Sequence, residues 1–102
     1  MSVMKITEEN FNEVRNSQKP VLLDFYADWC APCRMVSPIV SEIAEEHPEY
    51  LIAKINVDSS PALAGAFGVS SIPNLVVLKN GRVAEQTAGF YSKEQILSML
   101  QG

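Results

Sequence analysis

The residues of this chain best suited to chemistry are its only two cysteines, Cys30 and Cys33, which are separated by two residues. They could form a structural disulfide, half of a metal site, or a redox pair that opens and closes. A strand-like run precedes them and a helical pattern follows, so Cys30 is expected at a helix N-terminus, where unpaired N–H groups favour a thiolate and lower its pKa. Cys33 falls on the same side of the first turn, so the two sulfurs can close a small ring. Pro32 fits that turn, where its missing N–H costs nothing.

A redox pair is the interpretation that the surroundings favour. A C-x-x-C motif near βαβ structure, in a chain with no recognisable signal peptide, is a redox signal. A tetrahedral zinc site needs four ligands, and the only histidine, His47, lies several helical turns away. No metal site within the chain is therefore expected. Two rival hypotheses remain: a binding module whose thiols are incidental, and a metal or cluster site shared between two chains.

Asp24 and Pro73 are two further candidates. Asp24 lies in the apolar run "VLLDFYA", where a buried carboxylate is costly and tends to take up a proton. It lies at a wet edge, or satisfies a backbone group, or acts as a buried base that deprotonates the second thiol. Pro73 precedes a strand, a position that can be unremarkable or can hold a cis bond in a tight turn near the site. Spacing alone decides neither question.

The elements that must position these residues follow from hydrophobic periodicity and from capping signals. The run 21–27 is apolar almost throughout, which is typical of a strand buried on both faces in the middle of a parallel sheet. The order β-α-β-α-β-α-β-β-α predicts parallel βαβ units and a late antiparallel hairpin, giving a mixed sheet with helices on both faces. Strands are expected at 3–6, 21–27 and 51–57, a hairpin over 74–87, and helices over 8–18, 62–67, 92–100 and from the cysteines to Pro48.

Local signals refine these boundaries. Thr7 and Ser60 are expected to cap the helices that follow them, and Ser92 with Gln95 matches a capping box. The pair Asn80–Gly81 supplies the two positive-φ residues of a tight hairpin turn.

Composition narrows the function. The chain has 102 residues, which predicts one domain spanning 1–102. Twelve acidic and eight basic residues give a net charge of -4, which argues against a nucleic-acid surface. The longest apolar runs are too short to cross a bilayer, so no membrane partner is expected. The cytoplasm, where disulfides are mostly transient or catalytic, is the expected location.

Several motifs, in order along nearly the whole chain, resemble those of the thioredoxin family. They are "FYADWCAPCRMVSP", "VLLDF", "KINVD", "SIPNLVVLKNG" and "AGFYS". The resemblance implies the thioredoxin fold, an α/β architecture in which a central mixed five-stranded sheet is flanked by four helices.

The resemblance also implies roles for individual residues. Cys30 would be the exposed nucleophile and Cys33 the resolving thiol, with Asp24 as the buried acid/base and Lys54 near it. The Ile72–Pro73 bond would be cis, and the Ile72 backbone would pair with the substrate chain. A shallow apolar docking surface would consist of Trp29, Ala31, Pro32, Ile72, Pro73 and Gly89.

The implied activity is the reduction of disulfides in cytoplasmic proteins, without a bound cofactor. A thioredoxin reductase, flavin- or ferredoxin-linked, would recharge the protein. An oxidase or isomerase role would depend on the reduction potential alone. The chain departs from the family pattern at three positions. Ala31 replaces a glycine and bears on the potential, whereas Asn74, in place of a threonine, and the bulky Phe90 bear on substrate range.

Overall fold

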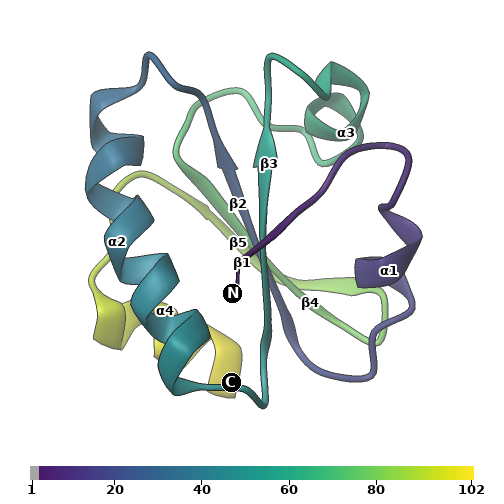
Figure 1. Ribbon diagram of the computed structural model, residues 1–102, viewed down its shortest axis with the longest axis vertical. Coiled ribbons are helices and arrows are strands. Elements are labelled where there is room, and N and C mark those ends of the chain that lie inside the picture. The colour runs from purple at the N-terminus through teal and green to yellow at the C-terminus, as the bar shows by residue number, and fades with distance from the viewer. Residues whose placement is uncertain (1–2) are drawn as a thin grey trace.

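The protein is built around one five-stranded sheet with the strand order β1-β3-β2-β4-β5, as seen in a computed structural model that describes residues 3–102 (Figure 1). The order of elements along the chain is the one that the sequence predicts. The strands are β1 (Val3–Lys5), β2 (Val21–Tyr26), β3 (Leu51–Asn56), β4 (Asn74–Lys79) and β5 (Arg82–Ala88). The helices are α1 (Asn12–Arg15), α2 (Ala31–Glu46), α3 (Pro61–Ala66) and α4 (Lys93–Gln101).

Strand β2 lies at the centre of the sheet, and its residues Val21 to Phe25 are all buried. This confirms the strand buried on both faces. Its neighbours differ in direction, because β3 runs parallel to β2 whereas β4 runs antiparallel. This confirms the predicted mixed sheet with a late antiparallel hairpin, to which β4 belongs. This strand opens the C-terminal hairpin, and the hairpin enters the sheet in the opposite direction.

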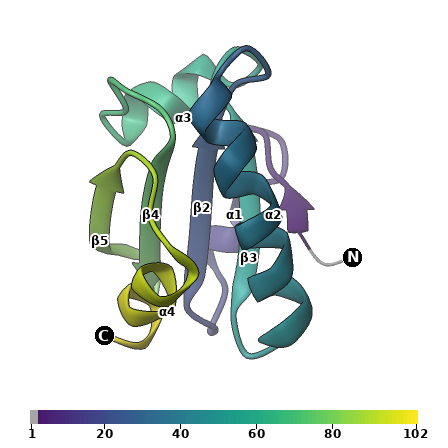
Figure 2. The ribbon, with the colours of Figure 1, turned by 90° about the vertical axis from the view of Figure 1, so that its left-hand side faces the viewer.

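Helices cover both faces of the sheet, α1 and α3 on one and α2 and α4 on the other (Figures 1 and 2). Successive side chains of a strand point to opposite faces. Accordingly, Leu23 and Phe25 pack in the cluster that includes α1 and α3, and Leu22 packs in the cluster that includes α2 and α4. Asp24 has the same parity as Leu22, so its side chain is directed to the face that α2 covers.

The hairpin and the last helix are built as the sequence predicts. Asn80 and Gly81 have φ values of 55° and 77°, which are those of a tight turn between twisted strands. The Ser92 side chain accepts a hydrogen bond from the Gln95 backbone N–H, and the Gln95 side-chain oxygen accepts one from the Ser92 backbone N–H. The capping box at α4 is thereby confirmed.

Of the two other predicted caps, Thr7 is wrong, whereas Ser60 is confirmed as the N-cap residue of α3 but makes no side-chain capping bond. Helix α1 begins only at Asn12, because Thr7 and Asn10 use their side chains in local turns: Thr7 N donates to Asn10 Oδ1, and Glu9 N donates to Thr7 Oγ1. Such local bonds compete with helix formation. Ser60 does stand at the N-cap of α3, but its hydroxyl makes no capping bond within residues 3–102. Its ψ of 63° departs from the extended conformation in which caps reach the next N–H groups.

Candidate functional site

Cys30 is the N-cap of α2, and its sulfur accepts a hydrogen bond from the Cys33 backbone N–H at 3.2 Å. The two cysteines form a disulfide with a Cα–Cα distance of 5.2 Å, which confirms that the spacing closes a small ring. Ala31 and Pro32 make the first turn of the helix. This turn is preorganised, since proline already has a helical φ and has no N–H to leave unpaired.

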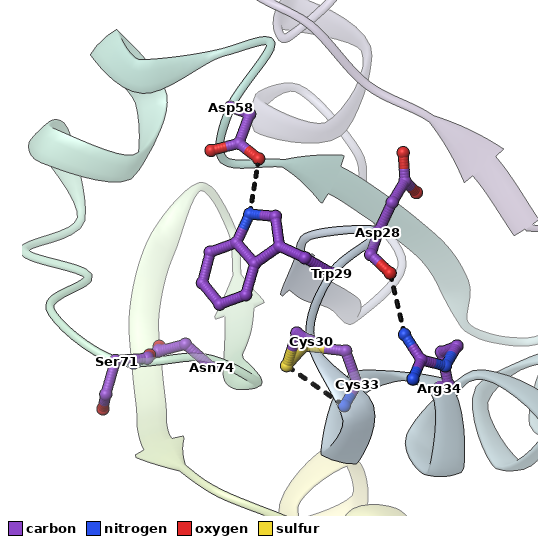
Figure 3. Close-up of a disulfide and its surroundings, with 8 residues drawn as sticks. All are labelled: Asp28, Trp29, Cys30, Cys33, Arg34, Asp58, Ser71 and Asn74. Carbon is purple, nitrogen blue, oxygen red and sulfur yellow. Dashed lines mark hydrogen bonds between the residues drawn. A yellow bond between two sulfur atoms is a disulfide. The ribbon is translucent and has the colours of Figure 1, made fainter.

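Hydrogen bonds on two sides hold the loop between β2 and α2 (Figure 3). Trp29 Nε1 donates to Asp58 Oδ2 at 2.8 Å, which ties the loop to the segment after β3. Arg34 Nη1 donates to the Asp28 carbonyl at 2.9 Å, which ties the loop to the helix. The disulfide therefore lies at the carboxyl end of the central strand, on a segment fixed from both directions.

The disulfide is less accessible than the resemblance implied. Cys30 is only 5% exposed and Cys33 3% exposed, so the expectation of an exposed Cys30 is wrong for this oxidised form. The physical reason is packing, because half-buried apolar side chains, Val57 and Ile72 among them, cover the pair. The two cysteines differ in what they adjoin rather than in their exposure.

Asp24 lies beneath this region, 4% exposed, and its Oδ1 has no hydrogen-bond partner within residues 3–102. Burial raises the pKa of Asp24 from 3.8 to about 7, and the Lys54 ammonium partly opposes this rise. Lys54 is its register partner on β3. The buried interpretation of Asp24 and the proximity of Lys54 are both confirmed, whereas a wet edge is excluded.

A cavity of about 320 Å³ connects Asp24 with one of the two cysteines. Cys33 lines this cavity, and Cys30 does not. The remaining lining residues are Lys5, Tyr26, Ala27, Asp28, Arg34, Ser37 and Lys54. Cys33 and Asp24 thus line one shared cavity.

A second hollow, of about 390 Å³, lies on the other side of the disulfide and is mostly apolar. Its lining residues are Trp29, Val57, Val69, Ser70, Ser71 and Ile72, and it is called the docking groove below. Trp29, 70% exposed, forms one wall. Ile72 belongs to the opposite segment, and this residue also packs on the cysteine pair. The groove could hold an extended chain beside the sulfur atoms.

The remaining residues of the expected docking surface are arranged around this groove. Ala31 and Pro32 are exposed at the start of α2, whereas Pro73 is buried. The Ile72–Pro73 bond is cis, as the resemblance implied. The Pro73 carbonyl accepts a bond of 2.8 Å from the Gly89 backbone N–H, which brings the half-buried Gly89 to the site.

Sequence reasoning missed part of the groove. Val57, Val69, Ser70 and Ser71 line it, and Asp58 holds Trp29, but none of them stood out among ordinary loop residues. The available signal was position: the "GVSS" segment directly precedes Ile72–Pro73, and "VD" follows the third strand. Loops at the carboxyl ends of strands are where binding residues gather.

Comparisons with known proteins give one consistent result. The family model described as Thioredoxin matches residues 2–102. Thioredoxin of Listeria monocytogenes is 47% identical, covering 92% of this chain and 91% of that protein. Thioredoxin of Alicyclobacillus acidocaldarius is 43% identical, covering 97% and 95%. Among solved structures, a mutant thioredoxin from Halobacterium salinarum superimposes with a TM-score of 0.92 at 34% identity, covering 98% of this chain and 88% of that one.

Proposed function

This chain belongs to the thioredoxin family and is a protein dithiol–disulfide oxidoreductase, and from that premise we propose that Cys30 is its attacking thiol, Cys33 its resolving thiol and Asp24 the base that serves Cys33. Its fold is the thioredoxin fold, and its redox couple is the Cys30–Cys33 disulfide. One observation supports the division of roles. Only Cys33 shares a cavity with the buried carboxylate, whereas Cys30 occupies the helix N-cap.

The reduced protein begins with a thiolate on Cys30, which the N–H groups at the start of α2 stabilise. This thiolate attacks one sulfur of the substrate disulfide. A mixed disulfide forms, the substrate S–S bond breaks, and the leaving substrate thiolate takes up a proton from water. The docking groove holds the substrate chain beside Cys30 during this step.

The second step closes the ring. Asp24, with a pKa of about 7 that burial has raised, accepts the Cys33 proton across their shared cavity near neutral pH. The Cys33 thiolate attacks the Cys30 sulfur of the mixed disulfide. The Cys30–Cys33 bond forms, and the second substrate thiolate leaves and takes up a proton. The substrate has gained two electrons and two protons, and the protein has become the disulfide described here.

A reductase must return those electrons. Thioredoxin relatives imply such a partner and disulfide-bearing protein substrates in general. We propose a flavin- or ferredoxin-linked thioredoxin reductase, acting on this protein in the cytoplasm. Within residues 3–102 no helix is long and apolar enough to span a membrane.

Insulin reduction tests the proposed function. With dithiothreitol as electron donor, wild-type protein should precipitate the insulin B chain well ahead of the donor alone. Cys30→Ser and Cys33→Ser should each remain at the rate of the donor, because ring closure needs both thiols. A wild-type rate equal to that of the donor would instead support a binding module with incidental thiols. Metal bound to the purified protein would support the shared metal site.

A further inference from the structure

A chain of side-chain amide hydrogen bonds joins the core of the protein to the segment before Pro73. The Gln86 amide nitrogen on β5 donates to the Phe67 carbonyl at 2.9 Å and to Asn74 Oδ1 at 3.0 Å. The Asn74 amide nitrogen in turn donates to the Ser71 carbonyl at 3.4 Å. Asn74, at the centre of the network, is 6% exposed, whereas Gln86 and Ser71 at its two sides are exposed. The network involves one of the three departures from the family pattern.

The partners determine which way each amide points. The Phe67 oxygen can only accept, so the Gln86 atom facing it must be the nitrogen. That nitrogen has a second hydrogen, which requires an oxygen on Asn74. The remaining Asn74 atom is then its nitrogen, and it faces the Ser71 carbonyl, another acceptor. Each donor therefore meets an acceptor in only one arrangement of the two side chains.

The far end of the network is fixed in the core. Phe67 is the C-cap of α3, and its ring packs against Phe11 and Phe25 at centroid distances of 5.9 and 5.6 Å. Its carbonyl is among those that a helix end leaves without an intrahelical partner. Gln86 uses this carbonyl and thereby links a rigid part of the core to Asn74.

The near end acts on the peptide that joins Ser71 to Ile72. In a trans peptide the C=O and the N–H point in opposite directions. When Asn74 draws the Ser71 carbonyl toward the interior, the Ile72 N–H points away from it, and this N–H donates to no acceptor within residues 3–102. Ser71 and Ile72 both line the docking groove, and Ser71 and Asn74 lie on the segment that passes beside Trp29 and the disulfide (Figure 3).

We propose that Asn74 and Gln86 are positioning residues that orient the Ser71–Ile72 peptide, so that the Ile72 N–H can bond to the backbone of an extended substrate peptide. The inference rests on the proposed function and adds the residues that set the affinity for peptide over non-peptide disulfides. Neither residue touches the sulfur atoms, so their action is on binding and not on the redox step. A threonine at position 74 carries one polar atom in place of two and cannot form the same relay.

Two probes separate positioning from general structure: a cystine-bridged peptide, and dithiobis(nitrobenzoate), which has no peptide backbone. The variants are Asn74→Thr and Gln86→Met, the latter at an exposed position that tolerates substitution. Glu85→Gln, next to it on β5, is the matched control. Both network variants should raise KM for the peptide about fivefold with kcat unchanged, the effect of losing one well-oriented hydrogen bond. The aromatic disulfide should react as with wild type, and so should the control with both probes.

The double variant should be no worse than either single variant, because the two residues act through one relay. An unchanged peptide KM in Gln86→Met, or an equal loss with both probes, would overturn the inference while leaving the proposed function intact. A wild-type protein that reduced neither probe would overturn the proposed function and the inference with it. If Asn74→Thr fails to fold, Gln86→Met alone decides.

Discussion

At the scale of single residues, Asp24 and the cysteines illustrate what sequence can anticipate. The apolar run around Asp24 indicated a carboxyl that would take up a proton if buried, because hydrophobic neighbours on a central strand leave little room for water, but it left a wet edge open. The covering of Cys30 was not predictable in the same way. The burial of Cys30 depends on Val57 and Ile72, which lie on other loops and pack against the disulfide. Burial by segments distant in sequence is a tertiary property that local spacing cannot predict.

Asp24→Asn should make the fold more stable at neutral and higher pH. The folded pKa of about 7 exceeds the ordinary 3.8, so the folded state binds more protons between these values. The contribution of Asp24 to the free energy of unfolding is therefore fully present below pH 3.8. It decreases as the pH rises toward the folded pKa of about 7 and does not change further above that value. Asparagine removes that loss, on the order of 4 kcal/mol.

Urea unfolding of the oxidised protein at about pH 4 and about pH 8 tests this. The two proteins should be nearly equal at the lower pH and differ most at the higher. Disulfide turnover by the variant should also be slower, since Cys33 loses its base. A variant that was less stable at about pH 8 and equally fast would make Asp24 a structural residue.

At the scale of elements, strong local signals were sufficient where nothing competed with them. The Asn80–Gly81 turn and the Ser92 capping box formed as expected, because each is satisfied by residues adjacent in sequence. Thr7 is not the cap of α1, because its backbone N–H donates to the Asn10 side-chain oxygen in a local turn. Within the predicted helix 8–18, Val14 is fully buried, as expected for the apolar face of a helix. The periodicity could not show that only one turn of this segment would be helical.

Two glycines give an opposed pair of predictions for these elements. Gly81→Ala should destabilise the hairpin by roughly 1–2 kcal/mol, because φ is +77° there and a Cβ would lie 3.0 Å from the Arg15 carbonyl. Gly65→Ala, in α3, should stabilise by about 0.5–1 kcal/mol, because, apart from its chain neighbours and the helix backbone, no atom of the described residues lies within 4 Å of its Cβ position. Chemical denaturation measures both, and effects of the same sign would contradict this account of the backbone.

At the scale of the whole molecule, the docking groove is assembled from segments that are far apart in the chain. Trp29, Val57 and the 69–72 segment meet there because the central sheet brings the carboxyl ends of β2 and β3 together beside the segment entering β4. Sequence identified Trp29 and Ile72 as docking residues only through the family resemblance. The Asn74–Gln86 relay could not be predicted from the sequence, because this contact depends on the register between β4 and β5.

The chain has a net charge of -4, but the residues that line the docking groove are all uncharged. Substrate docking should therefore depend little on ionic strength, since added salt weakens mainly contacts between charges. We expect KM for a peptide disulfide to change less than twofold between about 0.05 and 0.5 M salt. A tenfold rise in KM would show that charged residues outside the groove hold the substrate.

The central claim is the division of labour between the two thiols, and covalent trapping tests it most directly. Each single-cysteine variant, reduced and then mixed with an oxidised protein substrate, is examined by non-reducing gel electrophoresis. Cys33→Ser should accumulate a mixed disulfide, because Cys30 can attack but nothing resolves the bond. Cys30→Ser should trap little, because Cys33 lines the Asp24 cavity and not the docking groove. Equal trapping by both variants, or trapping mainly by Cys30→Ser, would contradict the assigned polarity and with it the role of Asp24.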